Sequence, residues 1–160
     1  MKQEKTYENA LHKAAAYCSA SEKCEHDVRE KLLSWGISIA DTDKIITKLV
    51  AENFLDEKRF AQFFVRDKFR FNKWGKIKIA YALKQKQINP EFIQESLDSI
   101  DNEEYQSLLT ELLQSKIKGL KYKDKYDMQA KIYRFAQGRG FETGIVSRVF
   151  SKISDESFSE

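Results

Sequence analysis

The sequence contains only one proline and six glycines in 160 residues. These residue types favour turns and interrupt helices and strands, so their scarcity argues against long loops and tight hairpins. Hydrophobic residues make up 41 % of the chain and charged residues 33 %, which is typical of a folded protein rather than a disordered one. We therefore expect a soluble, helix-rich chain with short connections.

Long apolar runs are also missing. The longest uninterrupted run spans residues 14–18, whereas a helix that crosses a bilayer needs about 20 predominantly apolar residues. The N-terminal stretch MKQEKTYENALHK is too polar for a secretory signal peptide. We therefore expect a cytoplasmic protein with no membrane partner.

Cysteine and histidine are rare. Cys18 and Cys24 have His12 and His26 nearby, but their spacing matches no common zinc motif and no second cluster of these residues follows. In a reducing cytosol the two cysteines are expected to be free thiols. We therefore expect no metal site and no cofactor.

Motifs of common enzyme classes are absent as well. The sequence has no glycine-rich phosphate-binding loop, no Gly-x-Ser-x-Gly and no His-Glu-x-x-His. Asp56 and Glu57 are interpreted as the start of a helix rather than as a catalytic pair. The sequence therefore predicts a binding protein and not an enzyme.

Positive charge, by contrast, is concentrated in the centre of the chain. Residues 58–86 carry 10 basic side chains and 1 acidic side chain. The flanking segments carry 8 basic and 11 acidic residues over 1–57, and 10 basic and 13 acidic residues over 87–160. Clustered charge raises the local potential and steers association, so the central block predicts an acidic partner.

Several local signals mark the ends of helices. Asn89 followed by Pro90 is typical of a helix start, and Asp101 with Glu104 resembles a capping box. Gly36 and Gly119 are expected to end helices, because glycine tolerates the backbone conformation that follows a last turn.

Apolar residues recur with the same offsets in three segments of the chain. The matching triplets are Val28, Leu32 and Ile37; Ile79, Leu83 and Ile88; and Ile132, Ala136 and Phe141. A longer helical pattern precedes each, over residues 5–19, 57–72 and 102–118. We therefore expect an all-α fold of three tandem three-helix repeats, at residues 1–55, 56–100 and 101–160, the last with a polar C-terminal tail. Because such units bury their apolar stripes against neighbours, the array is expected to be elongated and curved.

The stretch LDEKRFAQFFVRDKFRFNKWGKIKIAYALKQKQI, residues 55–88, resembles the signature of the RecX family. The positions that fit are Asp56, Glu57, Arg59, Phe60, Ala61, Arg66, Gly75, Ile79, Leu83, Lys86 and Ile88. Lys58 is inserted between Glu57 and Arg59, and Gln87 replaces the glycine of the usual Lys-Gly-Ile ending, so this helix is expected to end differently. The triplicated pattern extends the resemblance over nearly the whole chain.

The resemblance implies regulation rather than catalysis. RecX-like proteins bind the filament that the RecA recombinase forms on single-stranded DNA, lodge in its groove and inhibit strand exchange and ATP hydrolysis. They thereby modulate recombination, DNA repair and the SOS response. Some also bind DNA directly, so single-stranded DNA, and secondarily double-stranded DNA, are expected as further partners. A monomer is expected, because a filament already supplies a repeating partner.

The central block separates into apolar and basic faces when it is placed on helices. Phenylalanines are expected in the core at positions 60, 63, 64, 69 and 71. The basic surface expected to contact RecA or DNA comprises Arg59, Arg66, Arg70, Lys73, Trp74, Lys76, Lys78, Lys84 and Lys86. Lys73, Lys76 and Lys78 lie near a predicted helix start, where free N–H groups favour an anion, so we expect an anion to dock there.

Two features of the basic regions leave their roles open. Trp74 fits either an interface contact or a plug between helices. A second basic and aromatic set in the third repeat comprises Tyr122, Lys123, Lys125, Tyr126, Arg134 and Arg139. Two alternatives to a RecA regulator also fit the sequence, namely a stand-alone nucleic-acid-binding helical module and a protein-binding helical adaptor.

Overall fold

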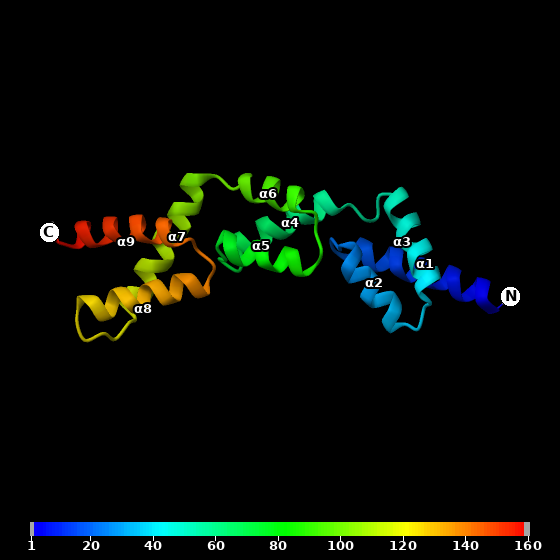
Figure 1. Ribbon diagram of the computed structural model, residues 1–160, viewed down its shortest axis with the longest axis horizontal. Helices are drawn as coiled ribbons and strands as arrows, with labels where there is room; N and C mark the ends of the chain where they lie inside the picture. Colours follow the sequence, from blue (N-terminus) through cyan, green and yellow to red (C-terminus); the bar gives the residue numbers. More distant parts are fainter. Residues whose placement is uncertain (1, 159–160) are drawn as a thin grey trace. The chain divides into compact units, whose positions relative to one another are not determined.

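The computed structural model describes residues 2–158, which form nine α-helices and no β-strand (Figure 1). The helices are α1 (Lys2–Ala20), α2 (Glu25–Ser34), α3 (Ile39–Ala51), α4 (Glu57–Arg70), α5 (Lys76–Gln85), α6 (Pro90–Asp98), α7 (Asn102–Lys118), α8 (Lys125–Gly138) and α9 (Thr143–Phe158). This confirms the prediction of an all-α helical repeat protein. No helix in the described part of the chain has the length and apolar character needed to cross a membrane.

Side-chain caps fix where several helices begin. The Asn89 side chain accepts a hydrogen bond from the Glu91 amide at 2.9 Å, and the Asp101 side chain accepts one from the Glu104 amide at 3.0 Å, as predicted. Asp56 caps the start of α4 through the Arg59 amide at 3.0 Å. Each cap satisfies an N–H group that has no partner inside its helix.

Three equivalent turns end the second helix of each repeat. Gly36, Gln87 and Gly140 all have positive φ, at 82°, 61° and 89°. In each turn the next residue donates to a carbonyl five positions earlier, as Ile88 does to Leu83 at 3.2 Å. The expectation that Gln87 changes the helix end was therefore wrong, because glutamine adopts the left-handed conformation that glycine has in the other two turns.

The chain divides into two compact units. The first unit comprises residues 1–64 and 83–96, and the second comprises residues 65–82 and 97–160. Helices α1, α2 and α3 pack against one another in the first unit, and α7, α8 and α9 do so in the second. The middle three-helix segment contributes residues to both units.

The core of the first unit is built from the apolar stripes of α1 to α3. Val28, Leu32 and Ile45 are fully buried there. Cys18 and Cys24 are buried in this unit, and neither forms a disulfide in the structure. Burial raises the pKa of the Cys24 thiol to about 12.

The core of the second unit is centred on Tyr105. The Tyr105 ring stacks on Phe69 at 5.7 Å between centroids and packs against Phe141 at 5.3 Å. Its hydroxyl lies within hydrogen-bond distance of the Glu142 carboxylate. This phenol joins α7 to the loop before α9 and gives the buried hydroxyl an acceptor.

Two predicted core phenylalanines lie at the surface. Phe63 is 47 % exposed and Phe71 is 80 % exposed, whereas Phe60, Phe64 and Phe69 are buried. The buried side of α4 is formed by residues 60, 61, 64, 65 and 69, and Phe63 falls outside that side, while Phe71 follows the last helical residue. Helical periodicity alone did not separate these positions, because the whole stretch is rich in aromatic residues.

Candidate partner-binding surface

The start of α5 is joined to the turn between α8 and α9. The Gly75 amide donates to the Arg139 carbonyl at 2.7 Å, and the Ile77 amide donates to the Gly140 carbonyl at 3.0 Å. Between them, the Lys76 amide donates to the Tyr105 hydroxyl at 3.0 Å. These three amides are therefore not the free N–H groups that the sequence analysis expected at this helix start, because acceptors within the unit already occupy them. An anion that docks here would meet the lysine side chains.

This junction admits no side chain at two positions. A Cβ atom on Gly75 would lie 2.5 Å from the Phe141 backbone nitrogen and would overlap the Gly140 carbonyl. A Cβ atom on Gly140, where φ is +89°, would lie 2.5 Å from the Lys78 backbone nitrogen. Two backbones thus approach each other directly, and this approach brings Arg139 of the third repeat beside residues 72–78.

Aromatic rings hold the basic side chains at this junction. The Trp74 ring lies under two ammonium groups, Lys68 at 5.3 Å and Lys78 at 4.7 Å from its centroid. The Phe135 ring lies under Lys116 at 5.1 Å and the Arg139 guanidinium at 5.5 Å. The Lys76 ammonium lies 5.0 Å from the Tyr105 centroid. We call these five residues, Lys68, Lys76, Lys78, Lys116 and Arg139, the ring-held cations.

Two ring-held cations also donate hydrogen bonds to backbone carbonyl oxygens. The Lys78 ammonium donates to the Gly138 carbonyl at 3.4 Å, and the Arg139 guanidinium donates to the Asn72 carbonyl at 2.9 Å. Neither residue forms an ion pair within the described part of the chain, and neither do Lys76 and Lys116. Rings and carbonyls orient a cation without neutralising it, so this face of the second unit keeps its positive charge.

Basic residues in the first unit are placed differently. Arg59 forms an ion pair with Glu22 at 2.7 Å, and Lys86 forms one with Asp27 at 2.7 Å. Arg59 also donates to the Asn53 carbonyl at 3.2 Å. These two predicted contact residues therefore tie separate segments of the first unit together, namely α4 to the connection after α1 and the turn after α5 to α2, and their charges are offset by carboxylates. Lys84, by contrast, is exposed and makes no ion pair among the described side chains.

Three other predicted contact residues lie in the second unit. Arg70 pairs with Glu104 at 3.3 Å. Arg66 is exposed and lines a cleft of about 220 Å³ with Arg70 and Glu104. Lys73 is exposed in the loop before α5, with φ at +57°. Arg66 and Lys73 therefore have charges free to meet a partner, whereas the charge of Arg70 is partly offset.

Trp74 lies in the loop between α4 and α5, before the first residue of α5. Trp74 is half-buried, and its amide donates to the Lys68 carbonyl at 3.1 Å. The ring thus supports two lysines at the surface.

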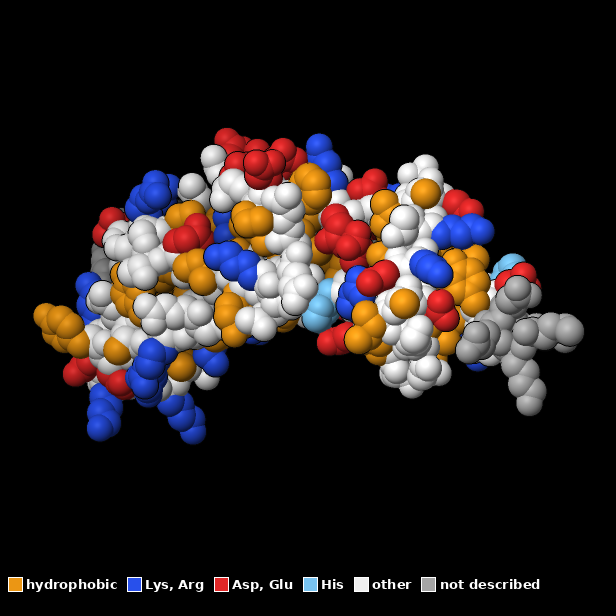
Figure 2. Space-filling view, turned by 45° about the vertical axis from the view of Figure 1, so that its right-hand side comes forward, with side chains coloured by type: hydrophobic (Ala, Val, Ile, Leu, Met, Phe, Trp, Pro, Cys, Tyr) orange, Lys and Arg blue, Asp and Glu red, His pale blue; other side chains and the backbone are white. Residues whose placement is uncertain are grey.

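The second basic and aromatic set lies on the loop before α8 and on α8 itself. Tyr122, Lys123, Lys125, Tyr126 and Arg134 are exposed. Arg139 is half-buried at the junction described above. In Figure 2 Lys and Arg side chains project at the lower left, where α8 and the loop before it lie in Figure 1.

Some residues of the surface were not singled out from the sequence. These residues are Lys68, which contacts Trp74, and Lys116 and Phe135, which contact each other. The packing of α4, α7 and α8 brings them to this surface. Ile77 and Tyr81 form an exposed apolar pair four residues apart on α5. The alternation of apolar and basic residues on α5 could have predicted the exposed pair of Ile77 and Tyr81. No spacing in the sequence could have predicted the contact between Lys116 and Phe135. Nowhere in the described chain do three or more potential metal ligands cluster.

The chain is similar to domains and proteins of the RecX family. The model for the second three-helix domain of RecX matches residues 56–97, and the model for the third three-helix domain matches residues 103–150. The chain is 36 % identical to a regulatory protein RecX of Clostridium botulinum over 129 residues, which is 79 % of this chain and 60 % of that protein. It is 28 % identical to a regulatory protein RecX of Clostridium acetobutylicum over 159 residues, covering 97 % of this chain and 73 % of that protein.

A solved structure has the same fold. The crystal structure of RecX from Lactobacillus salivarius superposes with a TM-score of 0.82 at 20 % identity, covering 92 % of this chain and 96 % of that one. Several of the curated relatives are longer, and this chain spans between 60 % and 64 % of three of them. The two domain models, the relatives and the shared fold agree, and the chain belongs to the RecX family.

Proposed function

We propose that the chain regulates the RecA recombinase by binding in the groove of its filament on single-stranded DNA and inhibiting it. Family membership supports a regulatory role, since the similar proteins bear the name regulatory protein RecX. By inhibiting the filament the protein would modulate recombination, DNA repair and the SOS response. We further propose that it acts as a monomer in the cytoplasm. Light scattering on the purified protein would measure its oligomeric state.

The observation that carries the contact surface is the set of ring-held cations without Lys68, which lies 3.9 Å from the Asp67 carboxylate. Lys76, Lys78, Lys116 and Arg139 have orientations set by rings and carbonyls, and no carboxylate in the described chain neutralises them. A fixed, unneutralised cation makes a stronger contact with an acidic surface than a mobile one, because less side-chain entropy is lost on binding. We therefore place the acidic surface of the filament against this face of the second unit.

The test is a titration of DNA-dependent ATP hydrolysis by the cognate RecA. A groove-binding regulator is expected to inhibit at amounts well below one molecule per RecA protomer. The double variant K76A/K78A is expected to need at least about tenfold more protein for the same inhibition, since two oriented charges are lost. The control K44A/K48A removes two exposed lysines of α3 and is expected to inhibit like the unmodified protein.

The same titration separates the alternatives. Inhibition only at amounts that cover the DNA would replace the proposed function with that of a stand-alone nucleic-acid-binding module. A chain that binds neither DNA nor RecA would indicate an adaptor for another protein. Equal inhibition by K76A/K78A and the unmodified protein, with both folded by circular dichroism, would overturn the ring-held cations as the contact surface.

A further inference from the structure

Two large apolar side chains lie exposed next to each other on α5. Ile77 is 57 % exposed and Tyr81 is 65 % exposed. They are four positions apart in the helix, so they are neighbours on one face and about 6 Å apart along the axis. Ile79 lies between them in the sequence and is fully buried, so it supplies the core contact of this turn. We call Ile77 and Tyr81 the apolar pair.

The first repeat carries polar side chains at the equivalent positions. The apolar pair lies two positions before and two positions after Ile79. Around Val28, the equivalent buried residue of α2, these positions hold His26 and Glu30, whose side chains lie 3.2 Å apart, from Nε2 to Oε1. The second helix of a repeat therefore folds with a polar pair at this place on its surface.

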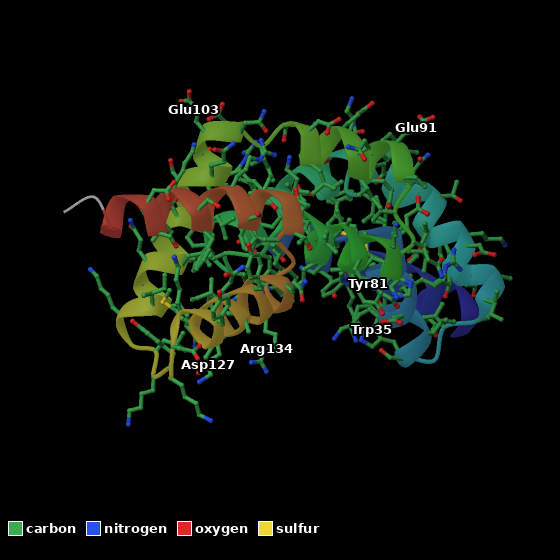
Figure 3. All side chains as sticks on the ribbon, turned by 60° about the vertical axis from the view of Figure 1, so that its left-hand side comes forward. Trp35, Tyr81, Glu91, Glu103, Asp127 and Arg134 are labelled. Atoms are coloured by element: carbon green, nitrogen blue, oxygen red, sulfur yellow. The ribbon has the colours of Figure 1, made fainter. Side chains whose placement is uncertain are left out.

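The third repeat leads to the same conclusion. Around Ile132 of α8, the equivalent positions hold Ala130 and Arg134, both of which are exposed. Figure 3 marks Tyr81 on α5 and its counterpart Arg134 on α8. Folding of the repeat therefore does not explain why α5 has apolar residues there. Neighbouring apolar side chains that are exposed without a need of the fold are typical of an interaction site.

The apolar pair stands on a fixed part of the second unit. The Ile77 amide donates to the Gly140 carbonyl at 3.0 Å, and the Gly75 amide donates to the Arg139 carbonyl at 2.7 Å. The close approach of Gly75 and Gly140 leaves the start of α5 no room to shift. A side chain on such a fixed backbone loses less entropy on binding than one on a mobile loop.

The charge around the apolar pair is positive. Residues 68–82 contain no acidic side chain. Lys76 and Lys78 precede and follow Ile77, and rings hold their ammonium groups at 5.0 and 4.7 Å from the ring centroids. An apolar centre with charged groups at its rim is the usual anatomy of a protein interface. The complementary surface is an apolar patch bordered by carboxylates.

We propose that Ile77 and Tyr81 form the apolar centre of the contact with the RecA filament and bury themselves in a hydrophobic patch of a RecA subunit that is bordered by carboxylates. This inference rests on the proposed function and deepens it, because it assigns this part of the contact to protein rather than to DNA. Tyrosine is enriched among the few residues that dominate binding energy at interfaces. The apolar pair then supplies most of the affinity, and the ring-held cations beside it orient the partner.

A protein surface fits the apolar pair better than the other candidate partners do. Single-stranded nucleic acid is bound by rings that stack on bases and by cations that contact phosphates. Ile77 has neither a ring nor a charge, so its exposure contributes nothing to such binding. A symmetric contact with a second copy of the chain would bring Lys76 and Lys78 of both copies together, and α5 has no acid to offset them.

The experiment measures binding of the labelled full chain to RecA filaments on single-stranded DNA by fluorescence anisotropy. Inhibition of ATP hydrolysis is measured on the same preparations. The variant I77A/Y81R takes the residues that the third repeat has at these positions. Alanine and arginine favour a helix more than isoleucine and tyrosine do, so urea unfolding is expected to show no loss of stability. The variant is expected to bind at least about tenfold more weakly, although it carries one more positive charge.

Two further comparisons separate the apolar contact from the charges. The control I39A/V50A removes two exposed apolar side chains of α3 and is expected to bind like the unmodified chain. The weaker binding of I77A/Y81A is expected to be the same at low and at high salt, because salt does not screen apolar burial. The weaker binding of K76A/K78A is expected to approach that of the unmodified chain as the salt concentration rises.

Equal or tighter binding by I77A/Y81R would overturn the inference, and tighter binding would indicate that this face meets phosphates, where an arginine helps. A dimer of the unmodified chain that I77A/Y81R converts to a monomer in light scattering would assign the pair to self-association and would also overturn it. The inference fails alone if the unmodified chain inhibits RecA and I77A/Y81R inhibits equally well. The proposed function fails alone if the apolar pair is needed for binding to the filament but ATP hydrolysis is not inhibited. An unmodified chain that does not bind the filament would overturn both.

Discussion

Gly75 and Gly140 lie so close together that a Cβ atom on Gly75 would overlap the Gly140 carbonyl group. This contact between two backbones brings the start of α5 against the turn between α8 and α9, through hydrogen bonds from the Gly75 and Ile77 amides. It also places Lys78 beside Gly138 and Arg139 beside Asn72. The hydrogen bonds that orient Lys78 and Arg139 therefore depend on two residues that have no side chain.

Replacing Gly75 by alanine is expected to destabilise the protein by about 3 kcal/mol or more, because backbone atoms cannot move aside as a side chain can. Urea denaturation followed by circular dichroism measures the loss. Gly138 is the control, since a Cβ atom there meets nothing within 4 Å. Gly138→Ala is expected to be neutral or to stabilise by up to about 1 kcal/mol. Equal effects of the two substitutions would contradict the close backbone contact.

Gln87→Gly is expected to stabilise the protein by about 0.5–1 kcal/mol. Glutamine at φ +61° has a steric cost that glycine lacks, and this gain exceeds the larger entropy that glycine loses on folding. Gln87→Ile is the opposite test, because it places a β-branched residue at this positive φ, and it is expected to destabilise the protein. The midpoint of urea unfolding reports both changes, and a less stable Gln87→Gly protein would show that the turn differs from those at Gly36 and Gly140.

Stability is expected to fall as the pH rises from about 9 towards 12, partly because of Cys24. Burial raises the pKa of the Cys24 thiol from 9.0 to about 12. Between these values the unfolded thiol has lost its proton and the folded one has kept it, so rising pH favours the unfolded state. The slope due to one such group reaches about 1.4 kcal/mol per pH unit.

Cys24→Ala isolates that contribution from those of other alkaline groups. Burial also raises the pKa of Cys18 and of Tyr17, so the variant is expected to retain part of the pH dependence. Unfolding free energies measured by urea denaturation between pH 8 and pH 11 give the two slopes. Parallel pH profiles for the variant and the unmodified chain would indicate that the Cys24 thiol ionises equally in both states.

Lys86→Ala is expected to affect stability rather than inhibition of RecA. Its ammonium pairs with Asp27 at 2.7 Å, and both side chains retain some solvent exposure, at 30 % and 20 %. Screening by solvent limits the loss to about 1 kcal/mol. Denaturation and the ATPase titration on the same preparation separate the two effects. An unchanged stability together with weakened inhibition would return Lys86 to the contact surface.

Much of the fold was accessible from local signals. The Asn89 and Asp101 caps, the helix end at Gly119 and the shared offsets of Ile37, Ile88 and Phe141 each depend on residues within one or two turns of chain. The wrong predictions concern positions at which one local sequence pattern is compatible with two different structures. Phe63 and Phe71 look like their buried neighbours, and Gln87 adopts a backbone conformation that its residue type disfavours.

By itself the sequence determined the helices, their repetition and the concentration of positive charge, because short-range hydrogen bonding and periodic burial encode them. Only the tertiary structure decided which of those charges remain available. Lys86 meets Asp27 from 59 positions away, whereas Lys76 lies on Tyr105 of α7 and Lys116 lies on Phe135 of α8. Whether a cation is neutralised depends on the groups within a few ångströms of it, and those groups are brought there by packing between helices distant in sequence.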